Sequence, residues 1–426
     1  MSAPAHLVRL LHGRWFRRLF AVRLSSQLSD GVFQVALASY ALFRQDQPSP
    51  GAIAAALAVV LLPFSLLGPF AGVLLDRWSR RQVLVWANLT RVGIASLAAA
   101  VVAADLPQPV FYGVVLACLS VNRFLLAGLS AALPHTVTRE DLVTANALTP
   151  TAGTLAFVCG LGAGAVTRGL GRSAGADGDV VVLLAAAGLY AVAGGLALRI
   201  PRPMLGPDFD PARPAVREAV RRVLGGLVDG LRHLRDRPSP AAGLAVIGSH
   251  RYWFGISSVA LVLLYRNHFH GPGEEDAAFA DLSVATLVGG LGFLAAALVT
   301  PTITDRLGPR RWILVLLGTA GVAQLFPGGL YTKPALLAAV FVLGLASQGI
   351  KICVDTLVQT GVDDAFRGRV FSLYDVLFNV AFVAAAASAA VLLPADGRSY
   401  PVLLLVSAGY LLTAVGYARM VPARSG

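Results

Sequence analysis

The sequence predicts an all-α membrane protein in which twelve transmembrane helices form two pseudo-symmetric bundles of six. Three observations predict this fold class: a strongly apolar composition, apolar runs of bilayer length, and one charged motif that occurs twice. Of the 426 residues, 56% are hydrophobic and only 14% are charged, whereas soluble domains carry about 25% charged residues. This composition is typical of a membrane protein.

Twelve apolar runs follow one another along the chain. A transmembrane helix needs about 20 predominantly apolar residues. Runs of that size lie at 17–43, 52–75, 82–103, 109–132, 143–167 and 180–199, and then at 241–265, 277–301, 312–330, 334–358, 370–393 and 400–419. We therefore expect a first bundle at 1–200, a linker at 201–240 and a second bundle at 241–426.

The linker is the one long polar stretch between the runs. It is rich in Arg and Pro and contains the amphipathic segment AVREAVRRVLGGLVDGLRHL. A helix with one apolar face and one basic face can lie in the plane of a membrane surface. We expect a cytoplasmic helix resting on the bilayer.

The basic residues indicate how the chain crosses the bilayer. The formal charge is +12, and most basic residues occupy short gaps between apolar runs, so a nucleic-acid partner is not expected. Basic residues accumulate on cytoplasmic loops. With the N-terminus inside, the outer loops hold only Arg44, Arg168, Arg172, Arg266, Lys333 and Arg398. This asymmetry predicts twelve spans with both termini in the cytoplasm.

One charged motif closes two of the apolar runs. GVLLDRWSRR ends at Arg81 and TITDRLGPRR ends at Arg311, and their aspartates, Asp76 and Asp305, are 229 residues apart. Both stretches fall at equivalent loops of the two halves. The recurrence therefore indicates an internal duplication.

The motif resembles the G-x-x-x-D-R-x-G-R-R loop of the major facilitator superfamily, and the span count agrees. Ser79 replaces the second glycine, and Pro301 stands where the second copy would carry the first. The resemblance implies that each aspartate locks onto the start of a helix in the other bundle, near Arg367 and Asp141. The alternative is that the arginines only enforce orientation. The matching residues are Gly72, Asp76, Arg77, Arg80 and Arg81, and then Asp305, Arg306, Arg310 and Arg311.

Polar residues inside the runs are candidates for the transport machinery, because ionisable groups in a bilayer are costly. Arg23, Gln27, Asp30 and Gln34 share one helical face of the first run. Asp30 lies near mid-membrane, where burial favours the protonated form of a carboxyl group. We expect Asp30 to be the proton site.

Other intramembrane charges rank below Asp30. The resemblance implies that Arg123 pairs with Asp30, although the pair could be purely structural. Lys351 and Asp355 are one turn apart and are expected to pair, with Lys351 a second-rank substrate or coupling residue. Further polar positions, interpreted mainly as local packing, are Asn88, Arg91, His250, Arg251, Asp375 and Asn379, of which Asp375 is also a candidate for the central cavity.

The run at 143–167 is rich in glycine, with Gly153, Gly160, Gly162 and Gly164. Small residues let helices approach closely. The stretch partly resembles a glycine motif of antiporters in the superfamily, although Leu161 stands where that motif has proline. The glycines could also serve packing alone.

These observations lead to one expected function and two alternatives. LSSQLSDG and VDDAFRGRVFSLYDVLFN resemble bacterial drug, siderophore and natural-product exporters of the superfamily. The resemblance implies a proton-coupled antiporter of an amphipathic or hydrophobic small molecule, acting as a monomer in the bacterial inner membrane. A nutrient importer and a non-transporting sensor or scaffold remain open. No enzyme activity, cofactor or metal is expected. His268 and His270 are interpreted as loop residues and not as metal ligands.

Overall fold

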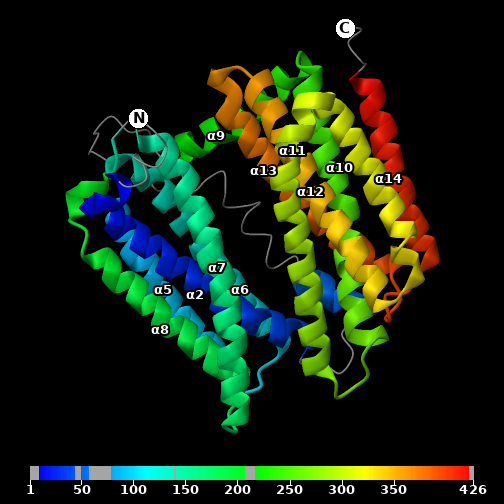
Figure 1. The fold of residues 1–426 in the computed structure, drawn as a ribbon. Helices are drawn as coiled ribbons and strands as arrows, with labels where there is room; N and C mark the ends of the chain where they lie inside the picture. Colours follow the sequence, from blue (N-terminus) through cyan, green and yellow to red (C-terminus); the bar gives the residue numbers. More distant parts are fainter. Residues whose placement is uncertain (1–8, 44–48, 57–77, 139–140, 207–215, 422–426) are drawn as a thin grey trace. The chain divides into compact units, whose positions relative to one another are not determined.

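The computed structural model describes residues 9–43, 49–56, 78–138, 141–206 and 216–421 (Figure 1). These residues are almost entirely helical and include no strand, which confirms the all-α fold class. The predicted run at 52–75 lies mostly outside the described residues, and every other predicted run is helical. The long helices are α2 (Arg14–Phe43), α5 (Arg80–Ala103), α6 (Gln108–Ala132), α7 (Leu142–Ser173), α8 (Gly178–Leu198), α9 (Val216–Arg235), α10 (Pro238–Leu263), α11 (Glu275–Leu325), α12 (Lys333–Gly361), α13 (Asp364–Leu392) and α14 (Tyr400–Met420).

Helix α11 contains two predicted runs and is broken between them. Its 51 residues would extend about 75 Å as one straight helix, more than twice the thickness of a bilayer core. Gly308 interrupts the helix with φ 77° and ψ 153°, a conformation that glycine adopts readily because it has no Cβ. Gly308 belongs to the second copy of the charged motif. At the equivalent position of the first copy, Ser79 has φ −55°, so the two loops differ in backbone.

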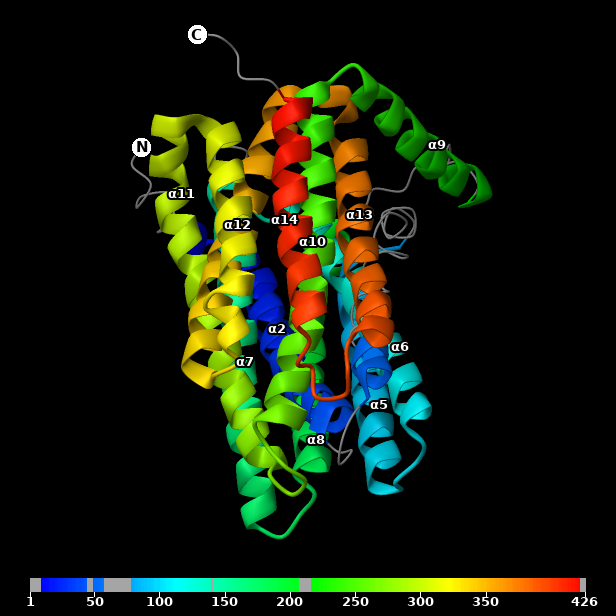
Figure 2. The ribbon, with the colours of Figure 1, turned by 90° about the vertical axis from the view of Figure 1, so that its right-hand side faces the viewer.

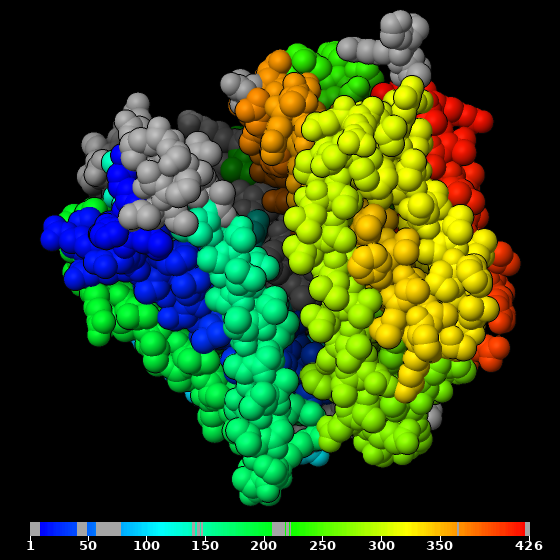
Figure 3. All heavy atoms as spheres, viewed as in Figure 1, coloured from blue at the N-terminus to red at the C-terminus, as the bar shows by residue number. Residues whose placement is uncertain are grey.

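The helices carry apolar side chains on their outer faces. Within the described residues, eight helical stretches are long and apolar enough to cross a membrane. Leu155 and Leu170 of α7 are 62% and 64% exposed, and Leu298 of α11 is 70% exposed. Figure 3 shows these helices in a space-filling view. Apolar surfaces of this extent are expected where lipid, and not water, surrounds the protein.

The chain divides into two compact units. The first comprises Met1–Ala41 and Leu66–Arg222, and the second comprises Leu42–Ser65 and Val223–Gly426. The division falls inside α9, the predicted amphipathic linker helix. In the first unit α5 packs against α6 and α8 (Figure 1). In the second unit α10 packs against α12, α13 and α14 (Figure 2).

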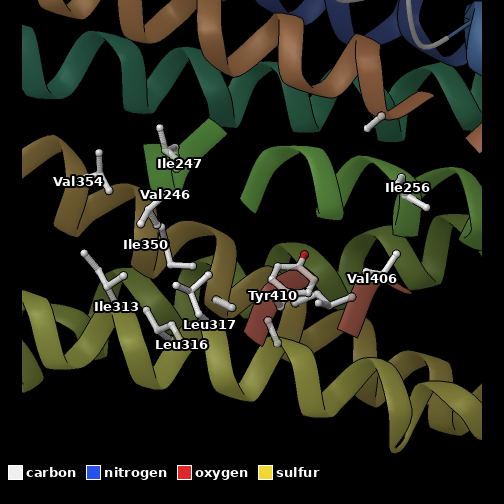
Figure 4. Close-up of a cluster of buried hydrophobic side chains, with 14 of the residues drawn as sticks. Val246, Ile247, Ile256, Ile313, Leu316, Leu317, Ile350, Val354, Val406 and Tyr410 are labelled. Carbon is white, nitrogen blue, oxygen red and sulfur yellow. The ribbon is translucent and has the colours of Figure 1, made fainter. Parts of the chain in front are cut away.

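The core of the second unit is a cluster of buried hydrophobic side chains (Figure 4). Side chains of α10, α11, α12, α13 and α14 meet there, and all are buried. The members labelled in the figure are Val246, Ile247, Ile256, Ile313, Leu316, Leu317, Ile350, Val354, Val406 and Tyr410. This packing fixes the helices that carry the polar residues of that unit.

Candidate functional site

A buried polar network occupies the interior of the first unit. Asp30 of α2 is 9% exposed and Arg91 of α5 is fully buried. Arg91 Nη1 donates a hydrogen bond to Asp30 Oδ1 at 2.6 Å, and the hydroxyl of Tyr190 in α8 donates to the same oxygen at 2.8 Å. Three helices that are distant in sequence therefore converge on one carboxylate.

The rest of the network binds the two terminal nitrogens of the Arg91 guanidinium, whereas its Nε is buried without a hydrogen-bond partner. Nη1 also donates to Asn122 Oδ1 of α6 at 3.0 Å, and Nη2 donates to Ser26 Oγ at 2.6 Å and to Asn88 Oδ1 at 2.7 Å. The guanidinium carbon lies 4.2 Å from the centroid of the Tyr190 ring. Additional hydrogen bonds of this kind offset part of the cost of burying an ion pair in an apolar interior.

The partner of Asp30 differs from the one that the family resemblance implied. The arginine in contact with Asp30 is Arg91, and not Arg123 of α6. Asn122, the residue next to Arg123, enters the network instead. The spacing of Asn88 and Arg91 on one face of an apolar helix was the available signal for this site. Tyr190 gave no sequence signal, since a single tyrosine in an apolar run is common.

The remaining residues of the α2 stripe have contacts outside this network. Arg23 Nε donates to Gln27 Oε1 at 3.3 Å. Gln27 lies against Gly153 of α7, where an added Cβ would overlap its amide oxygen. Gln34 is partly exposed. The predicted roles of Gln27, Gln34 and Arg123 in coupling stay predictions.

Glycines bring the backbones of α2 and α7 into contact beside Asp30. A Cβ at Gly160 would overlap the carbonyl oxygen of Leu28, and a Cβ at Gly31 would overlap that of Phe157. A Cβ at Gly164 would lie 2.9 Å from Val35 Cγ2. Gly162 points away, with no atom within 4 Å. Three of the four predicted glycines, Gly153, Gly160 and Gly164, therefore lie at the helix contact.

One arginine in each copy of the charged motif binds the end of a helix in its own unit. Arg81 donates to the carbonyls of Leu198 and Ile200 at 3.2 and 3.1 Å, at the end of α8. Arg310, its equivalent in the second copy, donates to those of Ala418 and Val421, at the end of α14. A cation stabilises the carbonyl-rich end of a helix. The duplication is therefore visible in the contacts as well as in the sequence.

Among the other motif residues, Arg80 binds backbone carbonyls and three residues of the second copy are exposed. Arg80 donates to the carbonyls of Ala131 and Leu205 at 2.9 and 3.1 Å. Asp305, Arg306 and Arg311 are exposed. Gly72, Asp76 and Arg77 lie outside the described residues, so the predicted locks between bundles stay predictions.

The second unit contains the predicted pair on α12. Lys351 Nζ lies 2.5 Å from Asp355 Oδ2, which confirms the intrahelical ion pair. Asp375 is exposed, and its backbone carbonyl accepts a hydrogen bond from Asn379 at 2.8 Å. In the loop between α10 and α11, His270 contacts Asp281 of α11 at 2.9 Å. The described residues include no group of ligands suited to a metal ion.

A helical chain with lipid-facing leucines and a buried charge network defines a multi-pass membrane protein. The sequence model of the Major Facilitator Superfamily matches residues 19–386 and 252–424. The chain belongs to the Major Facilitator Superfamily of membrane transporters.

Relatives agree with this assignment, and solved structures share the fold. An uncharacterized MFS-type transporter of Mycobacterium tuberculosis (strain ATCC 25618 / H37Rv) is 37% identical over 406 residues, covering 95% of this chain and 90% of the relative. A relative of the same description from Mycobacterium bovis matches equally. The nucleoside transporter NupG (D323A mutant) has a similar fold, with TM-score 0.68, 16% identity and coverage of 95% of this chain and 98% of that one. The POT family transporter PepTSo has TM-score 0.67, 12% identity and coverage of 96% and 97%.

Proposed function

We propose that this transporter exports an amphipathic or hydrophobic small molecule in exchange for protons. The observation that carries the proposal is the Asp30 carboxylate. It lies inside an apolar bundle and accepts hydrogen bonds from Arg91 and Tyr190. Intramembrane carboxylates of this kind serve as proton relays in many transporters. In this proposal the protein acts as a monomer in the bacterial cytoplasmic membrane with both termini inside.

Protonation of Asp30 would change the balance of the network. A neutral carboxyl group no longer forms an ion pair with Arg91, whose guanidinium keeps its hydrogen bonds to Ser26, Asn88 and Asn122. The interaction of α5 and α8 with α2 at Asp30 would therefore weaken. Gly31, the next residue, contacts the backbone of α7, so a shift of α2 is passed to α7 without an intervening side chain. Two arrangements of α2 that differ in proton occupancy are what alternating access requires.

The proposal is tested by dye transport in everted membrane vesicles energised by respiration. With a panel of cationic, neutral and anionic amphipathic dyes, the wild type should accumulate at least one dye inside. Asp30→Asn should abolish accumulation driven by the proton gradient and retain exchange of dye for dye. The matched control is Asp236→Asn, an exposed carboxylate after α9.

Three outcomes would contradict the proposal. Gradient-driven release of dye in place of accumulation would indicate an importer. Full activity in Asp30→Asn, together with loss of coupling in Asp375→Asn, would assign the proton site to the second unit. Absence of transport and exchange for every dye would favour a sensor or scaffold.

A further inference from the structure

The second unit holds an arginine surrounded by aromatic rings. The guanidinium carbon of Arg251, in α10, lies 4.2 Å from the ring centroid of Phe378 and 4.5 Å from that of Phe382, both in α13. The ring of Phe254, one turn along α10, is 5.5 Å away. Aromatic faces attract a cation through their negative π-clouds. They do not act as conventional hydrogen-bond acceptors for the five N–H donors of the guanidinium.

Arg251 has no counter-ion among the residues that the structure describes. Its Nε is buried without a hydrogen-bond partner, and none of its N–H groups donates to a protein oxygen in that part of the chain. The adjacent His250 is fully buried, and neither of its ring nitrogens has a hydrogen-bond partner. Arg251 is itself partly exposed. A charge without a counter-ion in an apolar bundle is unfavourable, so a residue of this kind is a candidate for ligand binding.

A second cation, Lys351, lies close to the aromatic cluster around Arg251, but it has a carboxylate partner. The Phe378 ring stacks on Tyr374 at 6.1 Å, and Lys351 Nζ lies 5.6 Å from the centroid of Tyr374. Lys351 is already neutralised by Asp355 at 2.5 Å. A second positive charge therefore lies in the same cluster, but only Arg251 lacks an anionic partner.

We infer that Arg251 and the rings of Phe254, Phe378 and Phe382 bind the oxyanion of a small molecule that also carries an aromatic or apolar body. A guanidinium offers a planar pair of donors that matches a carboxylate or a phosphate. The three rings supply the apolar surface for the rest of the molecule. This inference rests on the proposed transport function only in taking the bound molecule to be the substrate, and it narrows the substrate class to organic anions.

The test is equilibrium binding to the full-length protein in nanodiscs of zwitterionic lipid, with naphthoate as the probe. The neutral isostere naphthamide serves as the comparison ligand. Naphthoate should bind at least about tenfold more tightly than naphthamide, because charged hydrogen bonds are lost in the amide. Arg251→Gln should remove this preference, and Arg251→Lys should retain part of it. Arg398→Gln, in an exposed loop, should bind both ligands as the wild type does.

Equal affinity of the wild type for naphthoate and naphthamide would overturn the inference, and this comparison needs no variant. A preference for naphthoate that persists in Arg251→Gln would also overturn it. If that variant does not fold, Phe378→Leu provides a second test, and it should weaken both ligands while keeping the preference for the anion. Asp30→Asn should bind naphthoate normally, so failure of proton coupling and failure of this site are distinguishable.

Discussion

Each unit contains an arginine in an apolar helix, and the two have opposite surroundings. Arg91 makes hydrogen bonds to four polar side chains of three helices, one of them a carboxylate. Arg251 contacts three aromatic rings and donates to none of the described residues. The comparison shows that an intramembrane charge is informative only with its partners. An arginine whose terminal nitrogens bind polar side chains of several helices holds those helices together, whereas one whose guanidinium meets only aromatic rings has its donors available for a ligand.

The largest effect that we expect is a loss of stability in Arg91→Ala. The change leaves Asp30 and Tyr190 buried without their cation, and breaking a buried pair from one side costs about 3–5 kcal/mol. Thermal or denaturant-induced unfolding of the purified protein in detergent measures this loss of stability. The double variant Asp30→Asn with Arg91→Gln should recover part of it, because no single charge is then left buried. A change below about 1 kcal/mol in Arg91→Ala would show that the network does not hold the first unit together.

A smaller effect is expected at the contact of α2 with α7. Gly160→Ala places a methyl group on the Leu28 carbonyl, and overpacking of this kind costs about 1–3 kcal/mol. Gly162→Ala is the matched control, since its Cβ would meet no atom within 4 Å, and it should stay within about 0.5 kcal/mol of the wild type. The same unfolding assay and the vesicle transport assay check both variants. Equal behaviour of the two would contradict the assigned backbone contact.

The smallest expected effect on stability is at Arg251, and it distinguishes the two arginines. Arg251→Met removes an unpaired cation from an aromatic cluster and replaces it with an apolar side chain of similar length. We expect stability unchanged or raised by about 1 kcal/mol, together with loss of the preference for naphthoate. A loss comparable with that of Arg91→Ala would mean that Arg251 is a structural residue and would weaken the comparison.

Much of the fold could be predicted from the sequence, because the length and polarity of each apolar run are local properties. The runs at 82–103 and 109–132 became α5 and α6 with shifts of one or two residues at their ends. The break in α11 was also predictable as two runs, although the positive φ of Gly308 was not. The boundary between the units was less accessible, since it falls within α9 and depends on tertiary contacts.

The candidate site was predicted only in part. Asp30 and the glycines of α7 were identified because polar spacing and small-residue density are visible along one helix. The partner of Asp30 was not, because Arg91 and Arg123 both lie in apolar runs and only the packing of α5 against α2 distinguishes them. The isolation of Arg251 was equally hidden, since a missing partner is a property of space and not of sequence.

The central claim is that Asp30 gains and loses a proton within its network. Infrared difference spectroscopy of the protein in lipid, recorded as the pH is lowered, tests it most directly. The chain has 23 Asp and Glu residues, so several carboxyl groups contribute carbonyl-stretching bands at low pH. The account predicts that one component of the wild-type spectrum is missing in Asp30→Asn and preserved in Asp236→Asn. Undiminished intensity of this component in Asp30→Asn would contradict the claim, because another carboxyl group would then carry the proton.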